Sequence, residues 1–387
     1  MLPLTRAWSD SVARQHRSAR DGRGLIAPLG CISLTFDAPV SLALRVALRD
    51  RLPTTRSQVW NEPATRCHLL FRTAAAEESF SVEALAPTGL APSAVERTTL
   101  PAGGTLVRPV FVIAAPRSGS TLLFELLSAA DDVWSLPGES HAVIEGLPAL
   151  ATELRGFHSD RLTAADATPL NVAALHASFL TELADRDGAR YLARPLDARP
   201  ARVRMIEKTP KNSLRVSFLR AAFADARFVF LHRAPAENIG SIVEAWQSGQ
   251  FVSRPSLPGW SGPPWSLLLP PGWAALDGRP LEELAAFQWQ AANCTALDDL
   301  QALAPHERCM LDYRELVAEP HATLSRLCAF LELPFGARLQ ARLAAPLPLS
   351  RSAVTPPDPD KWRRIAPGLA ALLPSLSSTV DRLRALR

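Results

Sequence analysis

The stretch VRPVFVIAAPRSGSTLLFELLSAA, residues 107–130, carries the strongest fold signal in the chain. Residues 107–115 are rich in β-branched and apolar side chains, a composition typical of a strand buried on both faces of a parallel sheet. Residues 121–130 form an apolar segment without proline, as a buried helix requires. A short loop with Pro116 and Gly119 joins the two. This order of strand, loop and helix predicts an α/β fold with an anion site at the helix start.

The pattern of strands and helices continues downstream of this stretch. We predict strands at ARFVFLHR (226–233) and CMLDYRELV (309–317), and helices at NSLRVSFLRAAF (212–223), ENIGSIVEAW (237–246), LEELAAFQWQAANCTALDDL (281–300) and ATLSRLCAFLEL (322–333). Strands that alternate with helices favour a three-layer α/β/α fold with a central parallel sheet and a phosphate-loop-like nucleotide site at the carboxyl ends of its strands.

Two regions depart from this pattern. Residues 1–105 hold short alternating runs such as GCISLTF, broken by Pro-rich connections, and we expect an N-terminal accessory segment of uncertain fold there, followed by the main domain at residues 106–387. Residues 251–273 are dense in Pro, Gly and Trp, which predicts a long ordered loop. That loop is a lid, a wall of an acceptor site or a packed structural element.

Composition excludes several classes of protein. The formal net charge of +4 is spread without a block of consecutive Lys or Arg, so we expect no nucleic-acid partner. No apolar run reaches the roughly 18 residues that span a bilayer, and the first residues lack the apolar core of a signal peptide, which predicts a cytoplasmic protein without a membrane partner. The five cysteines form no C-x-x-C pair, and we expect no metal site.

The loop at 114–123, AAPRSGSTLL, has the chemistry of a phosphate site. Backbone N–H groups at a helix start form an anion nest, and Gly119 lets the chain approach a ligand. The hydroxyls of Ser118, Ser120 and Thr121 add hydrogen-bond donors, and Arg117 adds a positively charged guanidinium with several N–H donors.

The loop is not the phosphate loop of nucleotide triphosphatases, because no Lys follows Gly119. The strand at 226–233 also ends in Arg233 rather than in a carboxylate that organises magnesium. The sequence therefore predicts anion binding without a metal ion.

Two segments resemble the sulfotransferases that use 3′-phosphoadenosine 5′-phosphosulfate (PAPS). PRSGSTLL is similar to their 5′-phosphosulfate loop, P-[KR]-S-G-[ST]-[ST], and FVFLHRAPAENIGSIVEAW is similar to their 3′-phosphate segment, in which an Arg and a Ser eight residues later hold the 3′-phosphate. The resemblance implies that Arg233 and Ser241 bind the 3′-phosphate. It also implies PAPS as sulfuryl donor, adenosine 3′,5′-bisphosphate as product, and no metal.

Two further segments match the catalytic part of the family. The G-E-S triplet at 138–140 resembles a segment that bacterial members share with tyrosylprotein sulfotransferases, and it implies Glu139 as the general base. His141 is the alternative base. The segment IEKTP resembles an E-K-T-P stretch and implies that Lys208, with Arg117, stabilises charge on the transferring group.

The resemblance covers roughly residues 108–370 and includes two further segments that contact the nucleotide in that family. MLDYRELVAEP resembles a strand whose tyrosine, Tyr313, contacts the nucleotide, and PDPDKWRRIAP resembles a late segment that closes over it with Lys361.

Lys361 is one of only three lysines in the chain, with Lys208 and Lys211. Because a lysine is a compact point charge, we expect lysines at sites in this arginine-rich chain, although Lys211 is equally a bystander. One position departs from the tyrosylprotein branch, which has an arginine in place of Ala245.

These residues together predict a sulfotransferase that moves a sulfuryl group from PAPS to an acceptor hydroxyl by direct in-line transfer. The acceptor is a small molecule, a sugar or a peptide tyrosine. One alternative is an ATP-dependent phosphotransferase with a degenerate phosphate loop, which requires magnesium. The other is a non-catalytic protein that binds PAPS or its product, in which Glu139 and Lys208 are dispensable.

Overall fold

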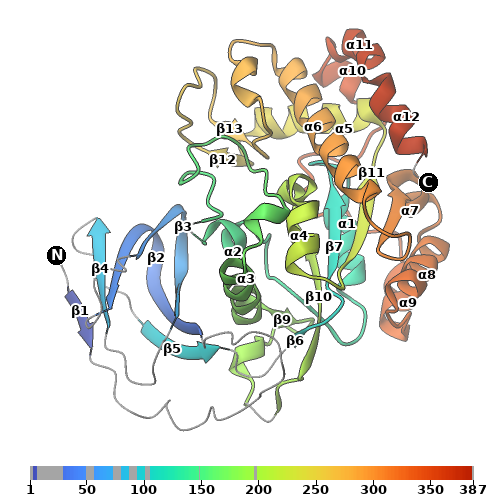
Figure 1. The fold of residues 1–387 in the computed structure, drawn as a ribbon. Helices are drawn as coiled ribbons and strands as arrows, with labels where there is room; N and C mark the ends of the chain where they lie inside the picture. The colour runs from blue at the N-terminus through green and yellow to red at the C-terminus, as the bar shows by residue number, and fades with distance from the viewer. Residues whose placement is uncertain are drawn as a thin grey trace.

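The computed structural model describes residues 3–6, 29–48, 56–72, 80–86, 94–100, 105–147, 149–195 and 198–385 (Figure 1). Among these, seven strands form the central sheet in the order β14-β11-β7-β10-β8-β9, with β6 beside β10. The bounds of these strands are β6 Thr105–Leu106, β7 Val110–Ala114, β8 Val133–Ser135, β9 Ala184–Asp185, β10 Arg202–Lys208, β11 Arg227–His232 and β14 Arg308–Asp312.

Helices connect and cover the strands. The α-helices are α1 Ser120–Leu127, α2 His141–Glu145, α3 Pro169–Glu182, α4 Val216–Ala222, α5 Pro235–Ser248, α6 Leu281–Gln301, α7 Tyr313–Ala318, α8 Pro320–Leu331, α9 Ala337–Leu343, α10 Trp362–Ile365, α11 Leu369–Leu372 and α12 Ser377–Ala385. The 3-10 helices are η1 Ala164–Asp166, η2 Tyr191–Ala193, η4 Pro210–Leu214, η5 Trp273–Leu276 and η6 Leu373–Leu376.

The central sheet is parallel except at one edge. β10 pairs in parallel with β6, β7 and β8, and β11 pairs in parallel with β7 and β14, whereas the short edge strand β9 runs antiparallel to β8. The α/β fold with a mostly parallel sheet between helices is therefore confirmed. The carboxyl ends of β14, β11, β7, β10 and β8 consequently lie along one edge of the sheet.

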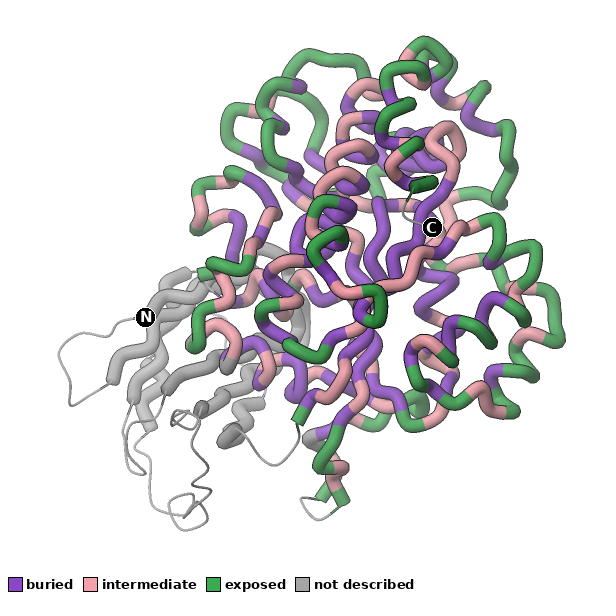
Figure 2. The backbone as a smooth tube through the Cα atoms, turned by 45° about the vertical axis from the view of Figure 1, so that its right-hand side comes forward, coloured by how far each residue is buried: buried purple, intermediate pink, exposed green. Residues whose placement is uncertain are grey.

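Two hydrophobic clusters cover the two faces of the sheet. Along β7, Phe111 and Ile113 enter one cluster, and Val110, Val112 and Ala114 enter the other, because successive side chains of a strand point to opposite faces. The first cluster includes residues of α3 to α6, and the second includes residues of α1, α7, α8 and α9. Buried segments accordingly run through the middle of the described part (Figure 2).

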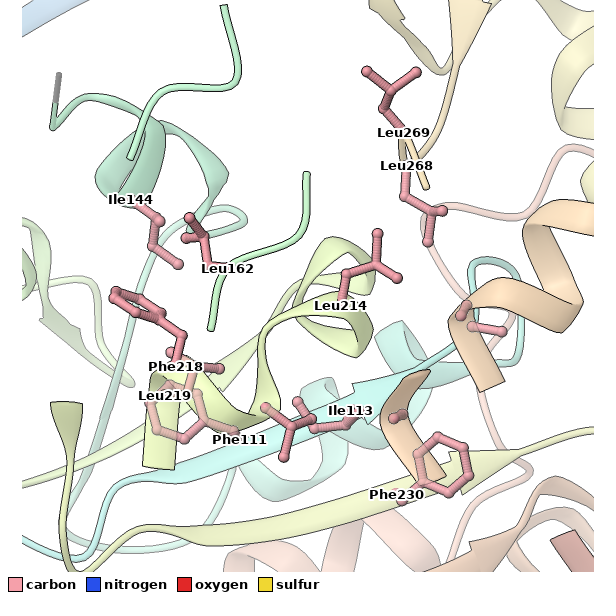
Figure 3. Packing of buried hydrophobic residues seen from close by; sticks show 14 of the residues in the cluster. Phe111, Ile113, Ile144, Leu162, Leu214, Phe218, Leu219, Phe230, Leu268 and Leu269 are labelled. Carbon is pink, nitrogen blue, oxygen red and sulfur yellow. The ribbon is translucent and has the colours of Figure 1, made fainter. Parts of the chain in front are cut away.

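The larger cluster packs the strand side chains against α4. Figure 3 shows Phe111 and Ile113 of β7 and Phe230 of β11 on the side of the sheet that faces Phe218 and Leu219. The Phe111 ring centroid lies 5.3 Å from that of Phe223 and 5.7 Å from that of Phe228. This packing fixes β7, and with it the loop that follows the strand.

The structure differs from the predicted elements at three places. The predicted strand 309–317 ends at Asp312, because the Asp312 side chain accepts a hydrogen bond from Arg314 N and caps α7. The predicted helix 212–223 divides into η4 and α4. Within residues 251–273, the structure has a small hairpin of β12 Val252–Arg254 and β13 Trp265–Ser266.

The N-terminal strands form a separate antiparallel sheet. It has the order β1-β4-β2-β3, with β5 paired to β2, and its bounds are β1 Pro3–Arg6, β2 Leu29–Leu48, β3 Arg56–Arg72, β4 Phe80–Ala86 and β5 Ala94–Leu100. The remainder of the accessory segment expected at 1–105 lies outside the described residues, and the domain boundary stays a prediction. Among the described residues, no helix has the length and apolar character needed to cross a membrane.

Replacement of a core aromatic residue tests the importance of the larger cluster. Phe111 is fully buried, so we expect Phe111→Ala to lower the free energy of unfolding by about 3–5 kcal/mol, measured by urea denaturation. The control is Leu154→Ala, whose side chain is 53% exposed and whose replacement is expected to cost less than about 0.5 kcal/mol. Equal losses in the two variants would contradict this account of the core.

Candidate active site

Many of the residues that the sequence singles out lie at or after the carboxyl ends of five neighbouring parallel strands. Tyr313 follows β14, Arg233 follows β11, the phosphate loop (residues 115–119) follows β7, Lys208 ends β10, and Glu139 lies in the loop after β8. The strand order therefore places them along one edge of the sheet in the order just given. This edge is the place where open α/β sheets bind ligands.

A cavity of about 370 Å³ lies at this edge. That volume is in the range of small-molecule sites. Most of the predicted site residues line it: Arg117, Gly119, Ser120, Thr121, Glu139, Arg233, Ser241, Tyr313 and Lys361. Two predicted residues, Ser118 and Lys208, are buried beside the cavity rather than in its lining.

The phosphate loop has a backbone conformation that favours glycine. Gly119 has φ +94° at the N-terminal end of α1, and a Cβ atom added there would lie 2.4 Å from Tyr313 Cε2. Arg117 is also left-handed, with φ 66°. Since the first N–H groups of a helix have no partner within the helix, the start of α1 presents donors to the cavity beside the Tyr313 ring.

Ser118 stabilises the loop from behind. Its hydroxyl oxygen lies 2.7 Å from the carbonyl oxygen of Ala115 and 2.8 Å from Asn238 Oδ1, and a hydroxyl has one hydrogen to share between these acceptors. Asn238 Nδ2 in turn donates to the carbonyl of Pro116 at 2.7 Å. Asn238 of α5 thus joins the loop to the neighbouring helix, a role that its place in the quoted segment ENIGS did not reveal.

Arg117 brings an unneutralised positive charge to the cavity. Its Nη1 donates to the carbonyl of Ser352 at 2.6 Å, and its guanidinium lies 4.6 Å from the centroid of the Phe251 ring. Its Nε is buried without a hydrogen-bond partner, and Arg117 is in no ion pair among the described residues. Burial, which outweighs the attraction of Glu244, and the nearby charge of Arg233 lower the pKa of Arg117. An anion bound next to Arg117 would offset both the cost of burying this charge and the repulsion from Arg233.

A second guanidinium lies at the end of β11. Arg233 Nε is 3.2 Å from Glu237 Oε2, and the Arg233 guanidinium lies 4.8 Å from the centroid of the Tyr313 ring. Glu237 also binds the exposed Arg314 at 2.8 Å. Ser241, buried in α5, joins Arg233 in the lining of the cavity. An arginine and a serine are thus together at the β11 side, as the 3′-phosphate hypothesis requires.

The C-terminal strap (residues 348–361) crosses the cavity. Thr121 Oγ1 lies 3.4 Å from Ser352 Oγ, and Lys361 Nζ donates to Glu244 Oε2 at 2.7 Å and to Thr355 at 3.1 Å. A Cβ atom added to Gly240 would lie 2.5 Å from Trp362 Cβ, so α5 and α10 pack closely beside Ser241. Lys361 therefore anchors the strap to α5 as well as lining the cavity. Glu244, its partner, was not singled out from the sequence.

The catalytic candidates form a contact pair at the other end of the cavity. Lys208 Nζ lies 2.5 Å from Glu139 Oε1; the lysine side chain is 5% exposed and the glutamate 36%. His141 Nδ1 lies 3.7 Å from the other carboxylate oxygen. Burial opposes ionisation of Glu139, but the hydrogen bonds and charges of His141 and Lys208 lower its pKa to about 2. The structure thus brings Glu139 into contact with Lys208 and places His141, the other candidate base, beside the same carboxylate.

An apolar wall, formed by Phe251, Val252, Leu267 and Leu268, completes the lining near Arg117. These residues come from the hairpin β12–β13 and its flanks, in the loop predicted at 251–273. The loop therefore forms a wall of the cavity.

Asp160 fixes this wall from behind. Its Oδ2 accepts from Leu269 N at 2.7 Å, its Oδ1 accepts from Arg254 at 3.0 Å, and its own N–H donates to the Leu269 carbonyl at 2.7 Å. Lys211, for which the sequence left open a site role or a bystander role, lines the cavity and belongs to the same buried charge cluster through Glu145 at 3.1 Å.

The sequence comparisons give the family. The model of the sulfotransferase family matches residues 109–337, more than half of the chain, and the protein therefore belongs to that family. Sulfuryl transfer is accordingly its general class of reaction. A comparison with curated proteins finds no match.

Solved structures to which this chain is similar include several sulfotransferases. Sulfotransferase STF9 from Mycobacterium avium is 20% identical, with TM-score 0.39, over 70% of this chain and 77% of that one. The sulfotransferase domain of the Synechococcus PCC 7002 olefin synthase is 19% identical, with TM-score 0.37, over 73% and 95%. Mouse sulfotransferase SULT7A1, solved with PAP, is 14% identical, with TM-score 0.37, over 73% and 88%.

The depressed pKa of Glu139 predicts a pH dependence of stability. A carboxyl whose pKa is lower in the folded protein stabilises it above the unfolded pKa, and this contribution is lost as pH falls through the folded pKa. We therefore expect the difference in unfolding free energy between the native protein and Glu139→Gln to be constant above about pH 5 and to shrink from about pH 4.5 toward about pH 2. Urea denaturation across the acidic range measures it; a pH-independent difference would contradict the ion pair.

Proposed function

We propose that the protein transfers a sulfuryl group from PAPS to an acceptor hydroxyl without a metal ion. The order of groups along the sheet edge carries this proposal. Arg233 and Ser241 lie on the β11 side, the phosphate loop lies at β7, and Glu139 with Lys208 lies at β8 and β10. A donor with a phosphate at each end fits the β11 side with one phosphate and the phosphate loop with the other. Its transferable group is then directed to Glu139 and Lys208.

The unneutralised charge supports an anionic ligand of this kind. Arg117 has a buried Nε without a partner and a pKa lowered by burial and by Arg233, so a phosphosulfate group fits this end of the cavity. PAPS, when bound, supplies an activated sulfuryl group attached to a good leaving group. Arg117, Ser120, Thr121 and the start of α1 then hold the 5′ side, and Tyr313 packs beside Gly119.

Glu139 is the proposed general base. The acceptor hydroxyl gives its proton to the Glu139 carboxylate as its oxygen bonds to sulfur, and the bond from sulfur to the 5′-phosphate oxygen breaks. A carboxylate of pKa about 2 is a weak base while Lys208 binds it. When Lys208 moves toward the charge that develops on the leaving oxygen, Glu139 loses one of the two groups that lower its pKa, and His141 remains. One lysine thus couples leaving-group stabilisation to base strength.

The cavity favours an acceptor with an apolar body. Val252 and Leu268 belong to the apolar wall, and Ser253 uses its hydroxyl to donate to the carbonyl of Leu267 at 2.5 Å. Lys211 is already paired with Glu145. A hydrophobic alcohol or phenol therefore fits this wall better than a sugar, whose many hydroxyls need partners. The side chain of a peptide tyrosine shares the phenol chemistry.

Calorimetry with adenosine 3′,5′-bisphosphate tests nucleotide use. We expect metal-independent binding that Arg233→Ala weakens by about 100-fold, because charge-assisted contacts to phosphate contribute about 1.5–3 kcal/mol each. Arg314→Ala is the matched control, since Arg314 binds the same Glu237 carboxylate but is 69% exposed and outside the cavity lining. Binding of ATP that requires magnesium, with no binding of the bisphosphate, would instead support the phosphotransferase alternative.

Removal of the catalytic pair tests turnover. With PAPS and a panel of phenols, alcohols and sugars as acceptors, we expect Glu139→Gln and Lys208→Ala each to lower kcat by about 10²–10⁴-fold while bisphosphate affinity is retained. His141→Ala separates the two candidate bases, and we expect it to retain most of the activity. Full activity of the Glu139 and Lys208 variants would rule out these roles, and binding without any turnover by the native protein would favour the non-catalytic alternative.

A further inference from the structure

A buried carboxylate lies directly before Lys208 in β10. Glu207 is 1% exposed and is in no ion pair among the described residues. Its Oε1 accepts from Thr209 Oγ1 at 2.5 Å and its Oε2 accepts from Asn212 Nδ2 at 2.8 Å, and the Ser140 hydroxyl is a third hydrogen-bonding partner. Burial raises the pKa of Glu207, against the hydrogen bonds of these partners. A buried carboxylate with several dedicated donors is costly, so its contacts warrant a specific explanation.

The Thr209 hydroxyl links Glu207 to the loop of the general base. Thr209 Oγ1 accepts a hydrogen bond from the backbone N–H of Ser140 at 2.6 Å, and Ser140 directly follows Glu139. A hydroxyl has one hydrogen, and Thr209 donates it to Glu207 Oε1. Glu207 therefore fixes the direction of the Thr209 hydroxyl, which leaves its lone pairs for the Ser140 N–H.

Asn212 and Ser140 complete the network. Asn212 Nδ2 donates to Ser140 Oγ at 3.1 Å, and Ser140 Oγ lies 3.1 Å from Thr209 Oγ1. The two partners of Ser140, Thr209 and Asn212, lie 69 and 72 positions away from it along the chain. The end of β10 thus supplies Lys208, which binds Glu139, and is followed by Thr209, which anchors Ser140.

The loop that carries Glu139 needs such an anchor. It contains Gly138, and a Cβ atom added there would meet nothing within 4 Å, so little packing restrains this part of the loop. The Glu139 side chain itself is 36% exposed at the cavity. Without the anchor, the carboxylate can leave Lys208, and its pKa then loses the part of the lowering that Lys208 causes.

We propose that Glu207 and Thr209 are positioning residues for the general base: they hold the Ser140 backbone so that Glu139 stays against Lys208 at the cavity. This inference rests on the proposed function, in which Glu139 accepts the proton of the acceptor. Neither residue lines the cavity or touches the reacting groups. Their action on the reaction passes through Ser140 and Glu139.

The pair Thr209→Val and Thr209→Ser tests the proposal. Valine preserves the shape and removes the acceptor for Ser140 N–H, whereas serine keeps the hydroxyl. With PAPS and the best acceptor from the panel, we expect Thr209→Val to lower kcat by about 10–100-fold, because small misplacements of reacting groups have effects of this size. We expect bisphosphate affinity to be unchanged and Thr209→Ser to resemble the native protein.

The pH profile distinguishes positioning from a general loss of structure. Glu139 faces two charged or titratable groups, Lys208 and His141. In Thr209→Val we expect the acidic limb in kcat to lie at a higher pH than in the native protein, because Glu139 loses the part of its pKa depression that Lys208 causes. Glu207→Gln should shift the profile in the same direction, since an amide can donate to Thr209 and reverse its hydroxyl. Native kcat and a native pH profile in Thr209→Val would overturn the proposal, as would an equal loss of kcat in Thr209→Ser or a parallel loss of bisphosphate affinity.

A measurement without an acceptor separates this inference from the proposed function. The Glu139 carboxyl can be titrated by carbon NMR on glutamate-labelled protein, with Glu139→Gln to assign its signal. We expect the Glu139 pKa to rise above its native value of about 2 in Thr209→Val, because the lowering by Lys208 is lost, whereas His141, which lies in the same segment, still lowers it. An unchanged pKa would refute the positioning role even in an active enzyme, and a raised pKa would support it even if no sulfuryl transfer is found.

Discussion

The ion pair between Glu139 and Lys208 depends on one constraint, the parallel pairing of β8 with β10. Because the two strands run in the same direction, the residues that follow β8 and the residue that ends β10 meet at one edge of the sheet. The resulting contact of 2.5 Å holds Lys208 beside a cavity, and the hydrogen bonds and charges of His141 and Lys208 together lower the pKa of Glu139. The buried hydrogen bonds of Glu207, Thr209 and Ser140 join the loop after β8 to the end of β10 at the same edge.

The same constraint extends along the sheet. β7 and β11 are neighbours, so the phosphate loop and Arg233 lie side by side, and Asn238 joins the loop to α5. The two hydrophobic clusters make the sheet a rigid support, because close-packed cores resist deformation. Binding groups on rigid strand ends need little reorganisation when a ligand arrives, which is the condition for efficient electrostatic stabilisation.

The sequence predicted the parts of this structure that have local causes. The buried strand at β7, the glycine at the start of α1 and the β11–α5 unit follow from short patterns, and the structure brings Arg117, Arg233 and Glu139 to one cavity. Their individual roles stay predictions.

The sequence did not reveal residues whose importance comes from distant contacts. Asn238 lies 120 positions from Ser118, and Thr209 lies 69 positions from Ser140. Asp160 likewise fixes a wall segment 109 positions away. Polar residues of this kind look like ordinary surface or loop residues until the fold buries them together. The central strand β10 was also not predicted, because Arg202, Arg204 and Lys208 interrupt its apolar pattern.

The central claim is that the order of groups along the sheet edge determines how a nucleotide with phosphates at both ends binds. A crystal structure with adenosine 3′,5′-bisphosphate tests this claim most directly. The account predicts the 3′-phosphate at Arg233 and Ser241, the 5′-phosphate on the phosphate loop beside Arg117, and the Glu139 and Lys208 pair just beyond the 5′-phosphate. A nucleotide bound in the reverse direction, or outside this cavity, would contradict it.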